Sequence, residues 1–280
     1  MRVHFPFFIA DPLETTVSTD VVSTRARVKQ TVPVAFGVFV VYCVLFIGRM
    51  KASGFAYDQI FNTAEGTWRG AVIPLVAGSV WLILFLAYAR WDHVFTDPRR
   101  LLMGVWFTIP PVLVLVAALL RFGGVSWGSF TSGHLLAIVC AGVLVGFAEE
   151  TLFRGIVLRA LRNGTRREAA VVLLSSLWFG FFHLTNLITG SPLNAVLSQC
   201  VQASALGIAL YLARRARGLL VFGMIIHGLW DTSAFAAGVH AIDGSALPLV
   251  SFGLAMIANL IAVIALIIIW RRKEIVAAAV

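Results

Sequence analysis

The segment LPLVSFGLAMIANLIAVIALIIIW, residues 247–270, carries no charged side chain from end to end. A helix rises 1.5 Å per residue, so roughly 20 apolar residues cross the hydrocarbon layer of a bilayer. In lipid, only a helix or a closed barrel satisfies all of its own backbone hydrogen bonds. A barrel strand needs only about 10 residues to cross. The segment therefore predicts a transmembrane helix.

Seven comparable runs precede this segment, at 32–48, 70–89, 101–120, 134–161, 169–186, 193–213 and 219–236. Hydrophobic residues make up 60% of the chain and charged residues 12%, whereas a soluble protein carries about 25% charged residues. We expect an all-α, polytopic membrane protein of about eight transmembrane helices. Pro110 and Pro111 lie inside the third run and predict a kink there.

The basic residues gather in short clusters between the apolar runs. If the N-terminus is cytoplasmic, the loops on that side carry 17 Lys and Arg residues and the opposite loops carry 4. Because cytoplasmic loops are enriched in Lys and Arg, this split favours a protein of the cell membrane with both termini in the cytoplasm. The net charge of +9 does not indicate nucleic-acid binding, because no groove-reading motif accompanies it. The bilayer is the expected partner.

Six ionisable residues interrupt the apolar runs. An ionisable side chain inside a bilayer costs several kcal/mol unless it is paired or hydrated, and such residues usually mark functional sites. The runs 134–161 and 169–186 are joined by a short polar turn and should pack antiparallel. Glu149 lies 14 residues before this turn and His183 lies 15 residues after it. Both residues are therefore expected at about the same depth, roughly 20 Å from the turn. We expect one buried site, open to water on the cytoplasmic side, formed by Glu149, Glu150, Arg154, His183, His227 and Asp231.

Spacing predicts how some of these side chains pair. Glu150 lies four residues before Arg154, and His227 lies four residues before Asp231, so each pair shares a helix face. Asp231 is expected to hold one ring nitrogen of His227 and so fix its tautomer. Adjacent helical residues point about 100° apart, so we expect Glu149 and Glu150 to face different partners.

Three motifs occur in order on separate spans: EETLFR at 149–154, FGFFH at 179–183 and HGLWD at 227–231. The pattern EExxxR, FxxxH, HxxxD/N resembles the CAAX prenyl protease 2 family, also called the CPBP or Abi family of intramembrane proteases. The resemblance covers roughly residues 133–235. It implies a four-helix catalytic core at 133–236. The flanking parts are then a cytoplasmic segment, 1–31, three spans, 32–132, and a last span with a short cytoplasmic tail, 237–280.

The resemblance implies a peptidase that cleaves a peptide or the tail of a membrane-associated protein. By position, Glu149 is then the catalytic carboxylate and His183 its partner in activating water. His227 and Asp231 stabilise the oxyanion or help to hold a metal. The supporting residues that shape the site are Glu150, Arg154 and Phe179, the last of which lies one turn before His183 and walls the pocket.

Members of this family are described both as metalloproteases and as metal-independent glutamate proteases. A divalent metal such as zinc would take its ligands from Glu149, His183, His227 and Asp231, which offer the nitrogen and oxygen donors that such an ion binds. The chain contains no His-Glu-x-x-His motif, so an ordinary zincin site is not predicted. Both cofactor states, a divalent metal and none, stay open at this point.

Other interpretations of the same residues exist. Buried Glu and His chains also form proton relays in transporters, although we find no paired repeats of the kind that carriers show. The third alternative is a non-catalytic membrane interaction or immunity protein on the same fold. A polar stripe at Asn194, Ser198 and Gln202 fits helix–helix contact and substrate contact equally well. The histidines expected to be non-catalytic are His4, His93, His134 and His240. The sequence does not reveal whether the substrate is prenylated.

Overall fold

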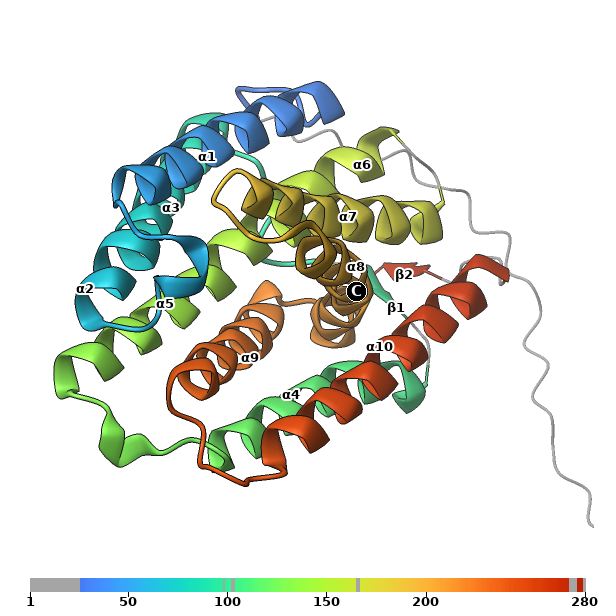
Figure 1. Cartoon of the computed structure of the whole chain (residues 1–280). Helices are drawn as coiled ribbons and strands as arrows, with labels where there is room; N and C mark the ends of the chain where they lie inside the picture. The colour runs from blue at the N-terminus through green and yellow to red at the C-terminus, as the bar shows by residue number, and fades with distance from the viewer. Residues whose placement is uncertain (1–25, 98, 102–103, 165–166, 272–275, 279–280) are drawn as a thin grey trace, which may run out of the picture.

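The computed structural model describes residues 26–97, 99–101, 104–164, 167–271 and 276–278. Within these ranges, eight helices are long and apolar enough to cross a membrane, and they run together as one bundle (Figure 1). The predicted all-α polytopic fold is confirmed. Most of the expected cytoplasmic N-terminal segment, residues 1–25, lies outside the described residues.

The eight spans coincide with the eight predicted runs, and four of them are composite. Here η marks a 3-10 or π turn. Single helices are α1 (Val32–Ala52), α8 (Leu193–Arg217), α9 (Leu220–His240) and α10 (Leu247–Arg271). The composite spans are α2 (Ala64–Thr67), η2 (Trp68–Val72) and α3 (Ile73–Ala89); η3 (Val105–Thr108) and α4 (Ile109–Gly123); α5 (Ser132–Glu150), η5 (Thr151–Val157) and α6 (Leu158–Gly164); and α7 (Glu168–Phe182) and η6 (His183–Leu187). Outside the spans lie η1 (Tyr57–Gln59), η4 (Trp127–Ser129) and the antiparallel pair β1 (Arg99–Leu101) and β2 (Val276–Ala278).

The two prolines of the third span do not kink it, and that prediction is wrong. Pro110 and Pro111 occupy the first turn of α4, directly after the 3-10 turn η3. In a first turn the backbone N–H groups have no partner within the helix, so proline removes no hydrogen bond there. The apolar run begins several residues before the α-helix does, which made the prolines look central.

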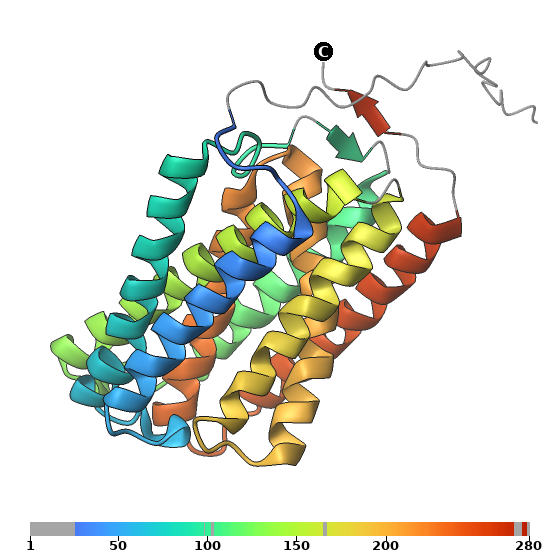
Figure 2. The same ribbon diagram turned by 90° about the horizontal axis from the view of Figure 1, so that it is seen from above.

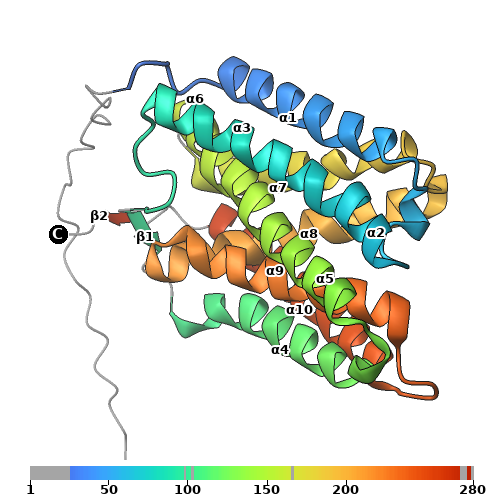
Figure 3. The ribbon, with the colours of Figure 1, turned by 90° about the vertical axis from the view of Figure 1, so that its left-hand side faces the viewer.

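Close contact between α5 and α9 brings the fourth and seventh spans together (Figure 3). A Cβ atom added at Gly142 would lie 2.9 Å from the carbonyl oxygen of Gly228, and one at Gly146 would lie 3.0 Å from the backbone nitrogen of Gly228. Small residues let helix backbones approach closely inside a membrane. The side chains that follow Gly146 on α5 therefore reach those of α9 directly.

Charged side chains form a buried network at the bundle end that carries β1 and β2; Figure 2 shows this end of the bundle. Arg162 Nη1 lies 2.7 Å from Asp97 Oδ2, and Arg215 Nη1 lies 3.3 Å from Asp97 Oδ2 and from Glu168 Oε1. Burial alone would raise the pKa of Asp97, but Arg162, Arg215 and Arg214 together hold it well below its usual range. Asp97 therefore stays ionised and ties the connection after α3 to α6 and α8.

Candidate active site

The six ionisable residues of the spans meet in the interior of the bundle, from elements that are distant in the sequence. Helix α5 contributes Glu149 and Glu150 at its last turn, and η5 contributes Arg154. His183 comes from η6, and His227 and Asp231 come from α9. Four are nearly inaccessible, with exposures of 6% for Glu149, 0% for Glu150, 0% for Arg154 and 3% for His227. The structure therefore brings together the six residues that the sequence predicts to converge: Glu149, Glu150, Arg154, His183, His227 and Asp231.

His227 lies at the centre of this group. Its Nδ1 atom lies 3.0 Å from Glu150 Oε1, and its Nε2 atom lies 3.5 Å from Asp231 Oδ2 and 3.9 Å from Glu149 Oε2. The shortest of these contacts is to Glu150, so Glu150 rather than Asp231 orients the ring. With the Nδ1–H group donated to Glu150, the Nε2 edge faces the other two carboxylates.

The expectation that Glu149 and Glu150 have different partners is wrong, because both face His227. An imidazole has a nitrogen on each of two edges, so two carboxylates about 100° apart on α5 flank one ring. The predicted ion pair within the helix does form, with Arg154 Nη1 at 2.9 Å from Glu150 Oε1. Glu150 thus connects Arg154 to His227, and its carboxylate is held from both sides.

Phe179 walls the site as predicted and also contacts three of its polar groups. Arg154 lies over the ring, with 4.1 Å from the guanidinium carbon to the ring centroid. The ring packs edge-on against His183 and His227, at centroid distances of 5.1 and 5.5 Å. The Phe179 carbonyl lies 3.0 Å from Nδ1 of His183. A carbonyl only accepts, so Nδ1 donates and Nε2 of His183 carries the free lone pair.

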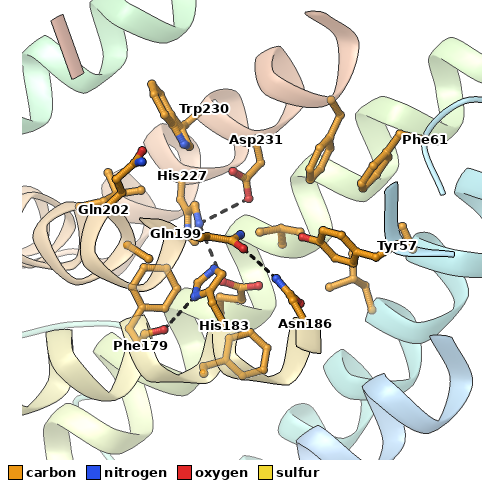
Figure 4. Close-up of a pocket in the computed structure, with 18 of the residues that line it drawn as sticks. Tyr57, Phe61, Phe179, His183, Asn186, Gln199, Gln202, His227, Trp230 and Asp231 are labelled. Atoms are coloured by element: carbon orange, nitrogen blue, oxygen red, sulfur yellow. Dashed lines mark hydrogen bonds and ion pairs between the residues drawn. The ribbon is translucent and has the colours of Figure 1, made fainter. Parts of the chain in front are cut away.

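A cavity of about 180 Å³ adjoins these residues (Figure 4). Because a water molecule takes up about 30 Å³ in the liquid, the cavity has room for several. Glu149, His183, His227 and Asp231 line it, whereas Glu150 and Arg154 lie behind them. Apolar side chains form most of the remaining wall, among them Phe46, Met50, Leu75, Phe182, Leu206 and Phe235.

The cavity extends toward the bundle end opposite β1 and β2. Its lining includes Tyr57 and Phe61 of the connection after α1, together with Asn186 of η6. The α1–α2 and η6–α8 connections lie at this end (Figure 2). The expected opening to water on the cytoplasmic side stays a prediction. Counting residues from the turn between α6 and α7 predicted the depth of the site. The count carried no information on the end of the bundle at which neighbouring helices leave space for a cavity.

Several residues of the cavity wall escaped the sequence analysis: Tyr57, Asn186, Gln199 and Asn259. Of the predicted polar stripe only Gln202 lines the cavity; Asn194 and Ser198 are exposed on α8. Gln199, which follows Ser198 directly, lines the cavity as well, so α8 contributes both Gln199 and Gln202 to the wall. Of the histidines expected to be non-catalytic, those in the described part of the chain lie outside the cavity lining, and His4 falls outside the described residues.

The donor set does not form a ready metal site. Within the ranges that the structure describes, no group of three or more His, Cys, Asp or Glu residues comes together so that it could hold a metal ion. His227 directs both ring nitrogens at carboxylates, and His183 has one nitrogen engaged by the Phe179 carbonyl. Metal binding by Glu149, His183, His227 and Asp231 therefore stays a prediction.

Comparison with known proteins supports the resemblance seen in the three motifs. Residues 131–233 match the model of a family described as "Type II CAAX prenyl endopeptidase Rce1-like". The match covers α5 through most of α9, the part of the chain that supplies all six ionisable residues. At the level of that family, it supports a CAAX-type intramembrane protease with a membrane-associated protein as its substrate. No curated protein and no solved structure matches the chain.

Proposed function

We propose that this chain, whose central spans match the CAAX endopeptidase family, hydrolyses a peptide bond in the tail of a membrane-associated protein. The observation that carries the proposal is the cavity, which is large enough for water and is lined by Glu149, His183, His227 and Asp231 inside an apolar bundle. A group of purely structural ion pairs needs no such space.

The attacking water lies between Glu149 and His183. Because Nδ1 of His183 is bonded to the Phe179 carbonyl, its Nε2 accepts a hydrogen bond from the water and orients it. Glu149 removes a proton as the water oxygen attacks the scissile carbonyl carbon, so Glu149 acts as a general base. The new carbon–oxygen bond gives a tetrahedral intermediate with a negative oxygen.

His227 stabilises this oxyanion. Three neighbouring carboxylates favour the doubly protonated imidazolium, whose Nε2–H group points into the cavity and donates to the oxyanion. Glu149 then passes its proton to the leaving nitrogen, the carbon–nitrogen bond breaks, and the products are a carboxylate and an amine. Glu150 orients the ring, Asp231 helps to balance its charge in this scheme, and Arg154 holds Glu150 in place.

A peptidase assay on detergent-purified protein tests the proposal. The probe is an internally quenched peptide with a C-terminal CAAX sequence, in farnesylated and unmodified forms. We expect Glu149→Gln to lower kcat by about 10² to 10⁴-fold, the usual contribution of a general base, while the melting temperature stays near wild type. The control is Glu65→Gln, because Glu65 is exposed and pairs with the exposed Arg69 four residues along the same span.

Full activity in Glu149→Gln would remove the catalytic assignment, and an unfolded Glu149→Gln would make Glu149 a structural residue. A proton-coupled carrier would instead show proton-driven flux in vesicles with no cleavage. An immunity or interaction protein would show neither activity. The ratio of rates for the two peptide forms reports whether the substrate is prenylated.

A further inference from the structure

The cavity contains a second polar group besides the ionisable one. Tyr57 of η1, Asn186 of η6 and Gln199 of α8 gather on one wall, and we call these three residues the amide cluster (Figure 4). Asn186 Nδ2 donates to Gln199 Oε1 at 2.9 Å. The Tyr57 hydroxyl interacts with both amide groups. Asn186 is 7% exposed, and Tyr57 and Gln199 are half-buried.

The amide cluster keeps much of its hydrogen-bonding capacity for another molecule. Once Asn186 has donated to Gln199 and both amides have bonded to the Tyr57 oxygen, one Gln199 N–H donor, the Tyr57 O–H group and the lone pairs of the Asn186 side-chain carbonyl are left. Burial raises the pKa of Tyr57; hydrogen bonding with Gln199 and Asn186 opposes this rise, and the charges of Asp231 and Glu149 add to it. Tyr57 therefore remains a neutral phenol, close enough to the reactive carboxylates to sense their charge.

The chemistry of the amide cluster matches a peptide main chain. A main chain presents neutral N–H donors and C=O acceptors, and a primary amide offers one of each kind without charge. Burying such groups without partners is unfavourable, so an occupant that satisfies them is stabilised. The cluster itself contains no charged side chain that would select a charged substrate residue. Its ligand is therefore recognised through its backbone.

We propose that Tyr57, Asn186 and Gln199 form a subsite that binds the substrate main chain beside the scissile bond. This inference rests on the proposed peptidase function and adds the way in which the substrate is held. Asn259 of α10 supports it independently, because its Oδ1 atom is a buried acceptor without a hydrogen-bond partner among the described residues and the residue lines the same cavity.

A purely structural role makes a different prediction. The connection after α1 is already tied to the η6–α8 turn through the backbone, with the Tyr57 N–H donating to the Thr189 carbonyl at 3.4 Å. Tyr57→Phe keeps that bond and the ring and removes only the hydroxyl. If the cluster only supports the fold, Tyr57→Phe and Gln199→Met change the melting temperature and leave substrate binding alone.

The experiment measures KM and kcat with the farnesylated quenched peptide for wild type, Tyr57→Phe and Gln199→Met. It also measures the Kd of the same peptide by fluorescence anisotropy for each change in a Glu149→Gln background, where cleavage is blocked. The control is Asn194→Ala, on the same helix α8 but exposed and outside the cavity lining.

We expect KM and Kd to rise about 3- to 10-fold in each variant, the range of one lost hydrogen bond, with kcat changing less than about twofold. Asn194→Ala should behave as wild type.

Two kinds of failure are distinguishable. Unchanged KM and Kd in both variants, or no binding of the peptide to Glu149→Gln protein, would overturn the subsite whatever the activity of the wild type. The other outcome is that peptide binding weakens in both variants, but wild type fails to cleave the peptide or Glu149→Gln still cleaves it. That outcome would keep the subsite and remove the proposed mechanism.

Discussion

Glu150 illustrates what spacing reveals about a single residue and what it does not. Its pairing with Arg154 follows from a separation of four residues on one helix, and the 2.9 Å contact agrees. Its contact with His227 depends on how closely α5 approaches α9, which no local spacing encodes. Ionisable side chains in spans stood out because they are rare there. Tyr57 and Gln199 did not stand out, because uncharged polar residues are common near helix ends.

Removing Arg154 should destabilise the whole protein. The side chain is 0% exposed, and Arg154→Met would leave the buried Glu150 carboxylate without its cation. Breaking one partner of a buried ion pair costs about 3–5 kcal/mol, so we expect a lower melting temperature in detergent and less folded protein. The control is Arg69→Met, whose pair with Glu65 is exposed and contributes about 0–1 kcal/mol. A wild-type melting temperature in Arg154→Met would contradict the role given to this pair.

At the level of elements, span number and approximate bounds followed from hydropathy, because each span must bury its backbone in lipid on its own. Details within spans did not. The π turn η5 directly after Glu150 and the 3-10 turn η6 that begins at His183 interrupt two of the predicted helices at the site itself. Such turns often accompany functional sites. Their positions depend on tertiary packing, so the apolar runs gave no sign of them.

The contact between α5 and α9 should be sensitive to a single methyl group. Gly146→Ala adds a Cβ that would lie 3.0 Å from the Gly228 nitrogen and would also collide with the Met224 carbonyl, so α9 must move away. Overpacking of this kind costs about 1–3 kcal/mol, and the shift also lengthens the His227–Glu150 contact. We expect a lower melting temperature and a loss of activity in the same variant.

The matched control for this prediction is Gly37→Ala on α1, where an added Cβ meets nothing within 4 Å. Alanine is favoured over glycine in a helix by up to about 1 kcal/mol, so Gly37→Ala should be neutral or stabilising. If Gly146→Ala kept both wild-type stability and wild-type activity, the close helix contact would not be what holds His227 against the α5 carboxylates.

The whole molecule separates its polar side chains into two levels. The arginine network around Asp97 lies at the end with β1 and β2, and the candidate active site lies deeper, with its cavity extending toward the other end. Between and around them the surface is apolar, with large side chains such as Val44 and Leu84 exposed by 66% and 61%. This arrangement suits a bundle surrounded by lipid. Which end faces the cytoplasm then decides from which side the substrate reaches the cavity.

Thiol labelling of intact cells with a membrane-impermeant reagent measures this orientation. Single cysteines replace Gly164, at the end with the arginine network, and Asp58 and Asp243, at the other end, in a background without Cys43, Cys140 and Cys200. The charge split of 17 to 4 predicts that Asp58→Cys and Asp243→Cys are labelled and Gly164→Cys is labelled only after lysis.

That result would place the end toward which the cavity extends on the non-cytoplasmic side, so that a cytoplasmic protein tail could reach Glu149 only by way of the bilayer. The opposite labelling pattern would contradict the charge-based orientation and open the same cavity to the cytoplasm directly. Labelling of Asp58→Cys and Gly164→Cys from the same side would instead contradict the span count between them. The tests of the amide cluster are unaffected, because purified protein in detergent exposes both ends.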